Sequence, residues 1–378
     1  MGVLTFTLLG LLIGSFANVV IHRLPRGASV VWPRSACPSC GHTLSAWELI
    51  PVVSHLVLRG RCRHCGAAIS WRYPFVELVT ALGFGVVASV WPPTVAPVVS
   101  VALAGWWTLL VIITFIDLQH HEIPDVLTLP GTAVMLLAAW AWGDPKSLPS
   151  IRDALVGALA GAGLLVFVNR LGALALRRFR DTEERLWPIG FDAVNLAALV
   201  GAIGGFTSGV ASIAASVAVN LVSRRSIRLP EPVLWAAWLA ALMAAPIGVG
   251  VLNAVTGSVL AAGMAALVGA AAWWIVDLRT GGEASEGQEP APGSDEPVAM
   301  GFGDVKLAAL LGVVLGWERL LVAVFLAVLL GAVVGVAARL RGGGRILPFG
   351  PFLAVAGAVT LLVGDAILRA YLTALGVG

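Results

Sequence analysis

The chain has 378 residues, of which 58% are hydrophobic and only 12% are charged, and its mean hydropathy is +0.92. Soluble globular domains carry about 25% charged residues, so this composition excludes a soluble domain and indicates a membrane protein. The formal net charge of +3 is too small to indicate a nucleic-acid-binding protein.

Long apolar segments recur along the chain, as expected for helices that cross a hydrocarbon core about 30 Å thick. We therefore predict an all-α polytopic membrane protein with about twelve transmembrane helices and a small zinc-binding loop in the cytoplasm. The predicted spans are 3–21, 75–92, 97–117, 126–142, 153–176, 192–206, 208–222, 232–248, 256–277, 304–317, 319–338 and 349–371. The first span lacks the basic start and the cleavage site of a signal peptide, so we expect it to be retained.

Arginines gather in alternate loops, which the positive-inside rule places in the cytoplasm, with both chain termini outside. The predicted organisation is a first transmembrane helix (1–21), a cytoplasmic four-cysteine loop (22–74), a membrane segment (75–176), an inserted segment of four spans (177–278), a flexible acidic linker (279–299) and a C-terminal membrane part (300–378). The linker prediction rests on its Gly, Pro, Ser and Glu content.

All four cysteines lie in the loop 22–74, as the pairs Cys37/Cys40 and Cys62/Cys65. Two CxxC pairs at this spacing can present four thiolates to one tetrahedral zinc ion. The alternative is two unrelated reduced pairs, because a reducing cytosol disfavours disulfides. Four cysteines leave no open position for a substrate, so we predict a structural rather than a catalytic zinc site.

Two aspartates stand at the cytoplasmic ends of predicted spans, Asp117 at the end of one and Asp304 at the start of another. Because they share a membrane depth, the two carboxylates can meet. A carboxylate pair that shares one proton can act as a base toward water and as an acid toward a carbonyl. Gly301 and Gly303 are expected to let a substrate backbone approach Asp304. The alternative is that Asp304 only caps its helix and Asp117 is a solvated helix end.

Several motifs together resemble the type IV prepilin peptidases, which belong to the GxGD class of intramembrane aspartyl proteases. These are "GSFANVVIHRLP" at 14–25, the two CxxC pairs, "RYPFVEL" at 72–78, "IDLQHHEIPD" at 116–125, "GFGDVKL" at 301–307 and "LPFGPFLAVAG" at 347–357. A lone GxGD motif would be weak evidence, whereas these motifs in this order, covering both ends of the chain, are highly specific.

The resemblance implies cleavage of the basic leader of type IV prepilins, or of type II secretion pseudopilins, after a glycine on the cytoplasmic side of a bacterial inner membrane. By the family pattern the catalytic pair maps to Asp117 and Asp304, and Asp125 is the weaker candidate. Many bacterial members also methylate the new amino terminus with S-adenosylmethionine, so this second activity is expected here, with a methyl-donor site that the sequence does not locate. The expected partners are the prepilin or pseudopilin substrates, membrane lipid and the pilus or secretion machinery.

Two further charged residues are candidates for supporting roles. Glu77, a carboxylate just inside the second span, needs a partner, for which we expect Arg72 or Arg23. Lys306 does not share the helix face of Asp304 and is expected to contact substrate or another acidic group.

The inserted segment resembles a degenerate copy of the surrounding motifs. Residues 190–206 match residues 301–317 without gaps, with Ala193 at the position of Asp304. A fainter match places Ser223 at the position of Asp117. We therefore predict an internal duplication with one surviving site; the alternative is chance similarity among helices rich in Ala, Gly, Leu and Val.

Two other functions remain open on the sequence. One is a membrane protease that has lost methylation or cleaves other membrane proteins. The other is a non-catalytic transporter or scaffold, for which ionisable residues near the bilayer midplane would be expected.

Overall fold

The computed structural model describes residues 2–143, 148–175, 191–223, 231–246, 248–280, 301–341, 347–374 and 376. Within these residues the regular structure is helical, apart from two isolated bridges. The long helices are α1 (Val3–Arg23), α3 (Arg72–Val90), α4 (Pro97–His120), α5 (Asp125–Trp142), α6 (Ile151–Ala175), α7 (Phe191–Ser223), α8 (Glu231–Ala244), α9 (Val249–Thr280), α11 (Phe302–Leu340) and α12 (Gly350–Ala374). Of the predicted linker, 279–299, the first two residues form the end of α9, and residues 281–299 lie outside the described residues.

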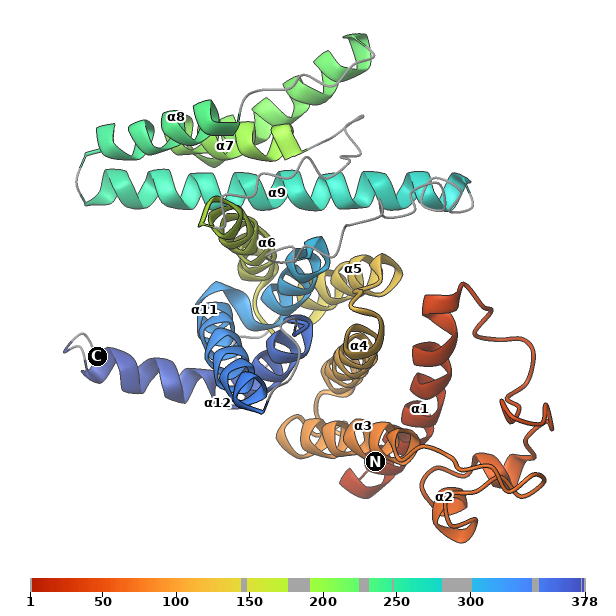
Figure 1. The fold of residues 1–378 in the computed structure, drawn as a ribbon. Coiled ribbons are helices and arrows are strands. Elements are labelled where there is room, and N and C mark those ends of the chain that lie inside the picture. Colours follow the sequence, from red (N-terminus) through yellow and green to blue (C-terminus); the bar gives the residue numbers. More distant parts are fainter. Residues whose placement is uncertain are drawn as a thin grey trace.

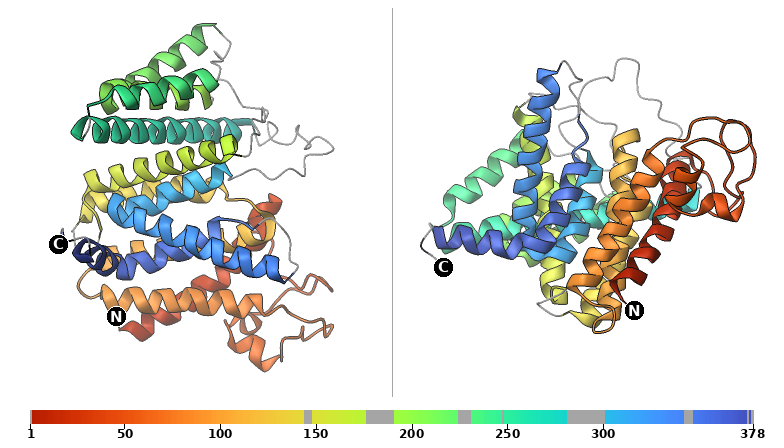
Figure 2. Two further views of the ribbon diagram at one scale, coloured as in Figure 1. Left: turned by 60° about the vertical axis from the view of Figure 1, so that its left-hand side comes forward. Right: turned by 90° about the horizontal axis from the view of Figure 1, so that it is seen from below.

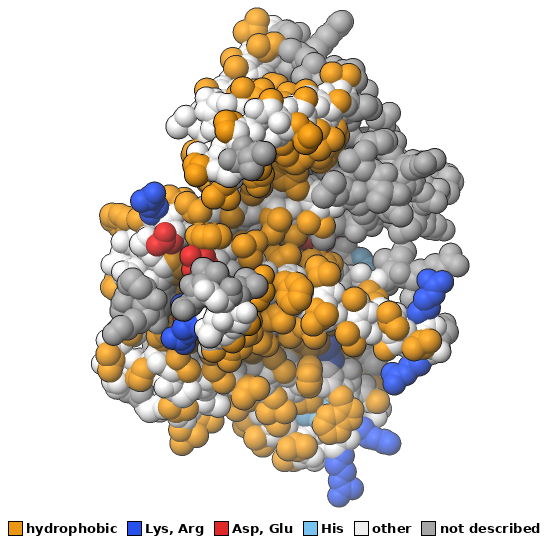
Figure 3. All heavy atoms as spheres, turned by 90° about the vertical axis from the view of Figure 1, so that its left-hand side faces the viewer, with side chains coloured by type: hydrophobic (Ala, Val, Ile, Leu, Met, Phe, Trp, Pro, Cys, Tyr) orange, Lys and Arg blue, Asp and Glu red, His pale blue; other side chains and the backbone are white. Residues whose placement is uncertain are grey.

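Nine helices in the described ranges are long and apolar enough to cross a membrane, and α8 contributes a shorter apolar helix, Val233–Ala244. The outer surface is also apolar, and the face drawn in Figure 3 shows charged side chains mainly near its edges. A large apolar surface needs a lipid environment, since water-soluble proteins rarely expose contiguous apolar patches of this extent. The prediction of an all-α, multi-pass membrane protein is therefore confirmed.

Two of these helices reverse direction at a glycine. The backbone of α7 is non-helical at Gly205 (φ 80°, ψ 179°), and that of α11 is non-helical at Gly316 (φ 73°, ψ 172°). In α7 the two halves lie against each other, because a Cβ at Gly209 would be 2.9 Å from the carbonyl oxygen of Ala197. Each of these two helices therefore provides two of the predicted spans, and each of the twelve predicted spans falls mainly on helix in the described residues, with 232–248 helical as far as Ala244.

The second half of α11 returns toward the end of the molecule at which α12 begins. Arg319, just after the reversal, forms an ion pair with Asp365 near the far end of α12. A Cβ at Gly331, further along α11, would lie 3.5 Å from Phe352 at the near end of α12. Both ends of α11 consequently lie on the side of the molecule where α12 starts.

The helices form a stack with α6 near its centre (Figures 1 and 2). One side of α6 packs on α11, which is flanked by α5 and α12, and the other side packs on α9, which is covered by α7 and α8. At the opposite end of the stack α4 contacts the pair α1 and α3, and the cysteine-bearing loop projects from these two helices (Figure 1). The core between α6 and α11 is built largely from small residues, which lets the helix backbones approach closely.

Candidate active site and metal centre

Asp117 lies three residues before the end of α4, with only 5% of its surface exposed. The helix ends at His121, which adopts a left-handed conformation (φ 55°) and donates its backbone N–H to the carbonyl of Asp117. The short segment after His121 leads through Ile123 and Pro124 into α5. This tight connection holds the end of α4 beside the start of α5.

Asp304 lies in the first turn of α11, where Gly301 is the N-cap residue in extended conformation. The backbone N–H of Asp304 donates to the Gly301 carbonyl at 3.2 Å, and the side chain is 6% exposed. A carboxylate in this first turn is stabilised by the positive end of the helix dipole. The N-cap residue is Gly301 rather than Asp304, but the helix-cap interpretation is compatible with this position, because the Asp304 carboxylate accepts a hydrogen bond from the Gly301 backbone.

The structure brings the two carboxyl groups together, although they come from distant parts of the chain. Ile123 lies between their two segments: its side chain is beside Gly350, which contacts Asp117, and beside Gly303, the neighbour of Asp304. The two carboxyl groups are within electrostatic reach of each other. Asp117 Oδ2 and Asp304 Oδ1 are both buried and have no hydrogen-bond partner in the structure. Two buried carboxyl groups with free oxygens can share a proton and bind a water or a carbonyl between them.

Glycines around this pair allow the close approach of neighbouring segments. A Cβ at Gly350, the first residue of α12, would lie 2.4 Å from Asp117 Oδ2, and the Gly350 backbone hydrogen-bonds to that carboxylate. A Cβ at Gly303 would lie 2.7 Å from the Cβ of Ile123, so this glycine makes room for the α4–α5 connection. A Cβ at Gly301 would have no atom closer than 3.8 Å. Of the two glycines, Gly301 therefore leaves the open space that we expected for a substrate backbone, and Gly303 does not.

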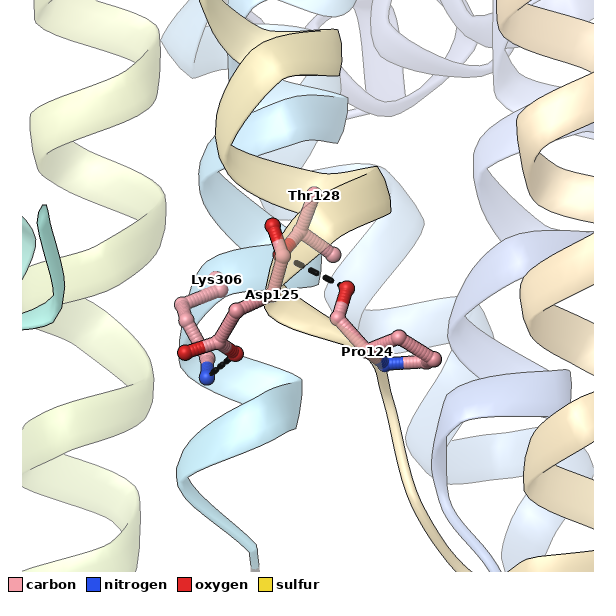
Figure 4. Close-up of polar contacts among 4 residues, drawn as sticks. All are labelled: Pro124, Asp125, Thr128 and Lys306. Carbon is pink, nitrogen blue, oxygen red and sulfur yellow. Dashed lines mark hydrogen bonds and ion pairs between the residues drawn. The ribbon is translucent and has the colours of Figure 1, made fainter. Parts of the chain in front are cut away.

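Lys306 and Asp125 form an ion pair that joins the starts of α11 and α5 (Figure 4). The lysine side chain is 9% exposed and the aspartate side chain 32% exposed. Lys306 Nζ also lies 5.5 Å from the centre of the Phe302 ring. Of the two partners expected for Lys306, the structure shows an acidic group, and this pair fixes the two helices that lead into the Asp117–Asp304 site.

Glu77 is buried in α3 and accepts a hydrogen bond of 2.8 Å from the backbone N–H of Val52. The hydroxyl of Ser15 on α1 is a second hydrogen-bond partner. The expected pairing with an arginine is wrong, because Arg23 donates to the carbonyls of Ser29 and Pro33, and Arg72 donates to the side chain of Gln119. Glu77 is therefore a buried carboxylate that neither of these cations neutralises.

The polar surroundings of Glu77 contain other incompletely bonded groups. Asn18 donates to the carbonyl of Tyr73 at 3.0 Å, while its own side-chain oxygen is buried without a partner. Both ring nitrogens of the buried His55 also lack partners. Buried polar atoms without partners are rare in folded proteins and are often found at binding sites. The group lies where the cysteine-bearing loop meets α1 and α3.

The four cysteine sulfurs, of Cys37, Cys40, Cys62 and Cys65, lie within 4.8 Å of one another. A tetrahedral zinc–thiolate centre with Zn–S bonds near 2.3 Å has sulfurs about 3.8 Å apart, and the Cys37–Cys65 separation is 3.9 Å. This arrangement can hold a metal ion.

The two halves of this centre have the same backbone geometry. Gly41 donates its N–H to the carbonyl of Cys37, and Gly66 donates to that of Cys62, both at 2.9 Å. Both glycines have positive φ, 69° and 72°, which L-residues with side chains rarely adopt. This repeated turn explains why a glycine follows each CxxC pair.

Backbone N–H groups aimed at sulfur favour the thiolate. The backbone groups of Ser39 and Cys40 lower the pKa of Cys37 to about 6. The backbone N–H of His42 lowers the pKa of Cys40, but desolvation and the nearby Cys65 and Cys37 sulfurs outweigh it and raise this pKa to about 11. A thiolate in the cluster thus opposes ionisation of the next thiol, and a bound divalent cation would remove this repulsion.

The sequence did not single out Gly350, Ile123 or Val52, although all three shape the candidate sites. Gly350 lies in a quoted motif, and a Gly-Pro pair at the start of an apolar run is a usable signal for a helix start close to another group. Val52 gave no signal, because a β-branched residue at φ 60° is unfavourable and is not anticipated from sequence.

The fold and these two sites define a polytopic membrane protein with a buried aspartate pair and a separate four-cysteine centre. A family model described as the bacterial peptidase A24 N-terminal domain matches residues 8–91. The model of the type IV leader peptidase family matches two successive segments, residues 102–223 and 225–336. The chain therefore belongs to the type IV leader peptidase family.

Curated relatives agree with this assignment over nearly the whole chain. A prepilin leader peptidase/N-methyltransferase of Pseudomonas aeruginosa is 31% identical over 98% of this chain and 93% of its own length. One of Aeromonas salmonicida is 32% identical over 97% of this chain and 92% of its own length. One of Myxococcus xanthus is 47% identical over a shorter region, 40% of this chain and 44% of its own length. No solved structure gives a significant match.

Proposed function

We propose that this protein is an aspartyl endopeptidase that removes the basic leader from type IV prepilins or type II secretion pseudopilins. The observation that carries the proposal is the pair of buried carboxyl groups, Asp117 and Asp304, each with a free oxygen. The names of the relatives, prepilin leader peptidase/N-methyltransferase, support the same substrate class. The site is assigned to the cytoplasmic face of the bacterial inner membrane, since it shares its side with the arginine-rich loops.

In this proposal one carboxyl group is ionised and the other protonated. Asp117 is the base, because the N-terminus of α12 at Gly350 stabilises a negative charge on it, and this charge in turn opposes ionisation of Asp304. It takes a proton from water as the water oxygen attacks the scissile carbonyl carbon. Asp304 donates a proton to the carbonyl oxygen, and the C–N bond breaks when the departing amine is protonated. An acid and a base in one dyad follow from the repulsion between two close carboxylates.

The test is leader removal from a matched prepilin by the protein reconstituted in liposomes. We expect Asp117→Asn and Asp304→Asn to abolish cleavage, because each removes one of the two proton-transfer groups, and Asp125→Asn only to weaken it. Equal cleavage by the wild type and all three variants would contradict the dyad and favour a transporter or scaffold. Correct folding is checked by the thermal unfolding midpoint of each variant.

We propose N-methylation of the new amino terminus as a second activity, located at Glu77. A buried carboxylate without a cation favours binding of a positively charged ligand. Within the part of the chain that the structure describes, the hydrogen-bond donors to Glu77 are neutral, from Val52 and Ser15. S-adenosylmethionine, when bound, supplies a methyl group from its sulfonium. Glu77 would hold the positive charge of the donor or of the amine, and the free oxygen of Asn18 would accept a hydrogen bond from the same ligand.

Glu77→Gln separates this assignment from the peptidase proposal, because it removes the charge while keeping the shape. We expect the variant to cleave prepilin like the wild type and to lose at least about 90% of methyl transfer, measured with isotopically labelled methyl donor. Methylation at the wild-type rate in Glu77→Gln would place the donor elsewhere. A wild type that cleaves without methylating would overturn methylation and leave the peptidase assignment intact.

The four cysteines are proposed to hold a structural zinc ion, since four thiolates fill its tetrahedral shell. Its role would be to fix the loop that carries Val52 and His55 against α1 and α3. The loop lies on the same side as the aspartate pair, because Arg72 at the start of α3 reaches Gln119 beside Asp117. The pilus or secretion machinery is the proposed destination of the processed substrate.

A further inference from the structure

The two glycine-rich helix pairs of the stack have matching sequences. Gly157 and Gly163 in α6 stand 100 residues before Gly257 and Gly263 in α9. In the same way, the hinge glycines of α7 and α11, Gly205 and Gly316, stand 111 residues apart. Gly201 in α7 and Gly312 in α11 have this spacing as well. These are positions at which the backbones touch, so the match can be tested in space.

The contacts of the two pairs match residue for residue. A Cβ at Gly157 would lie 2.1 Å from the carbonyl oxygen of Gly312 and 3.0 Å from the Cα of Gly316. A Cβ at Gly257 would lie 2.5 Å from the carbonyl oxygen of Gly201 and 3.1 Å from the Cα of Gly205. The packing of α6 on α11 is therefore repeated in the packing of α9 on α7.

The contact between α6 and α9 is reciprocal. A Cβ at Gly163 would lie 1.9 Å from the carbonyl oxygen of Val259, and one at Gly263 would lie 2.0 Å from that of Leu159. Leu159 and Val259 are themselves 100 residues apart. Gly163 thus meets the equivalent of Leu159, and Leu159 meets the equivalent of Gly163. Such an exchange of partners is the pattern of a two-fold interface.

The hinges and the remaining helices follow the same correspondence. Gly205 and Gly316 have nearly identical backbone angles, and each ends a first half-helix. α8 begins at Glu231 as α5 begins at Asp125, and each of these helices packs on the corresponding glycine-hinged helix, α7 or α11. The two segments matched by the family model, 102–223 and 225–336, each contain one helix of every matched kind: α5, α6 and α7 in the first, and α8, α9 and α11 in the second. In space α7 and α11 are exchanged between them, since α6 packs on α11 and α9 packs on α7.

We infer that α7, α8 and α9 form a second, silent copy of the unit that holds the aspartate pair, and that the contact of α6 with α9 at Gly163 and Gly263 is the interface through which the two copies bind each other. The unit with the aspartates consists of α4, α5, α6 and the first half of α11. In the silent unit Ala193, which is 2% exposed, occupies the position of Asp304. A methyl side chain cannot transfer a proton, so this unit has no dyad.

The silent unit thus acts as an internal dimer partner. It packs closely on the face of α6 at Leu159 and Gly163, where glycines on both helices let the backbones approach each other. The other face of α6 holds α11, and with it Asp304. The inserted segment is accordingly assigned a supporting rather than a catalytic role, which goes beyond the proposed peptidase function.

Matched glycine substitutions in the full-length protein test this inference. Gly157→Ala and Gly257→Ala place the same methyl group against equivalent backbone oxygens, so we expect similar decreases in the thermal unfolding midpoint. Only Gly157→Ala displaces the helix that carries Asp304, so we expect it to reduce the kcat of leader cleavage at least about tenfold, while Gly257→Ala retains at least half of the wild-type kcat. A loss of kcat in folded Gly257→Ala equal to that in Gly157→Ala would overturn the silent copy. So would clearly unequal unfolding midpoints.

A second pair covers the case in which these variants do not fold. Gly205→Ala and Gly316→Ala introduce a side chain at positive φ, where no atom lies within 4 Å of the new Cβ at Gly205 and only Pro149 does at Gly316. We expect equal decreases in the unfolding midpoint, with a decrease in kcat confined to Gly316→Ala. Unequal midpoints, or an equal loss of kcat in both variants, would contradict the two-fold relation.

Discussion

Gly350 and Asp117 are so close that a single methyl group at residue 350 would lie 2.4 Å from the carboxylate oxygen Oδ2. The contact places the first turn of α12 directly against the end of α4. The absence of a side chain at residue 350 is therefore what allows a helix N-terminus to face this carboxylate.

Gly350→Ala should consequently impair cleavage by moving α12 away from Asp117. We expect a decrease in kcat of at least about tenfold, because a displacement of about 1 Å at a catalytic group can cost about a hundredfold in rate. Cleavage assays with purified protein measure this effect. Gly105→Ala on α4 is the control, since nothing lies within 4 Å of the added methyl group; a wild-type rate in Gly350→Ala would show that this contact is not needed.

The Lys306–Asp125 ion pair should respond unequally to removal of its two partners. Asp125→Asn leaves the charge of Lys306 buried and unpaired, which costs about 3 kcal/mol in the free energy of unfolding. Lys306→Met removes the more deeply buried charge and leaves Asp125, 32% exposed, in contact with solvent, so the cost should be about 1 kcal/mol. Reversible unfolding in detergent measures both, and a larger effect of Lys306→Met would contradict the burial-based argument.

The ion pair of Arg319 with Asp365 provides a contrast at the other end of α12. It is bidentate, with distances of 2.6 and 2.5 Å, but the aspartate side chain is 54% exposed. Exposed ion pairs contribute about 1 kcal/mol or less. Asp365→Asn should therefore change the free energy of unfolding by less than about 1 kcal/mol and leave cleavage unchanged; a loss of cleavage would show coupling from this end of α12 to the aspartate pair.

The cysteine centre should bind one zinc ion per chain, measured by elemental analysis of the purified protein. Cys62→Ser should reduce the zinc content to below about 0.2 per chain, because three thiolates bind the ion more weakly than four. We expect the aspartate pair to stay intact, so that leader cleavage persists. Ser54→Ala, which lies in the same loop but outside the four-cysteine set, is the control and should retain its zinc.

The sequence predicted the meeting of Asp117 and Asp304 because membrane depth restricts where residues can lie. Both stand at the ends of apolar runs on the same side, so only their lateral positions remained to be found. The reversals of α7 and α11 were also anticipated as separate spans, since each apolar run is interrupted near a glycine.

Contacts between segments were harder to predict. Gly303 was expected to make room for substrate. Instead the side chain of Ile123, in the connection between α4 and α5, packs against it. Glu77 was expected to bind an arginine, but it accepts a hydrogen bond from Val52, whose backbone angles no sequence pattern indicates. Such details depend on tertiary packing, which overrides local preference.

The contact between Gly350 and Asp117 also fixes the order in which the surroundings of Asp117 are completed during synthesis. A chain is made from its N-terminus, so Asp117 enters the membrane long before the residues that complete its surroundings. Asp304 follows much later, and the first turn of α12 later still. A nascent chain that ends before α12 therefore carries both aspartates without the helix terminus that faces Asp117.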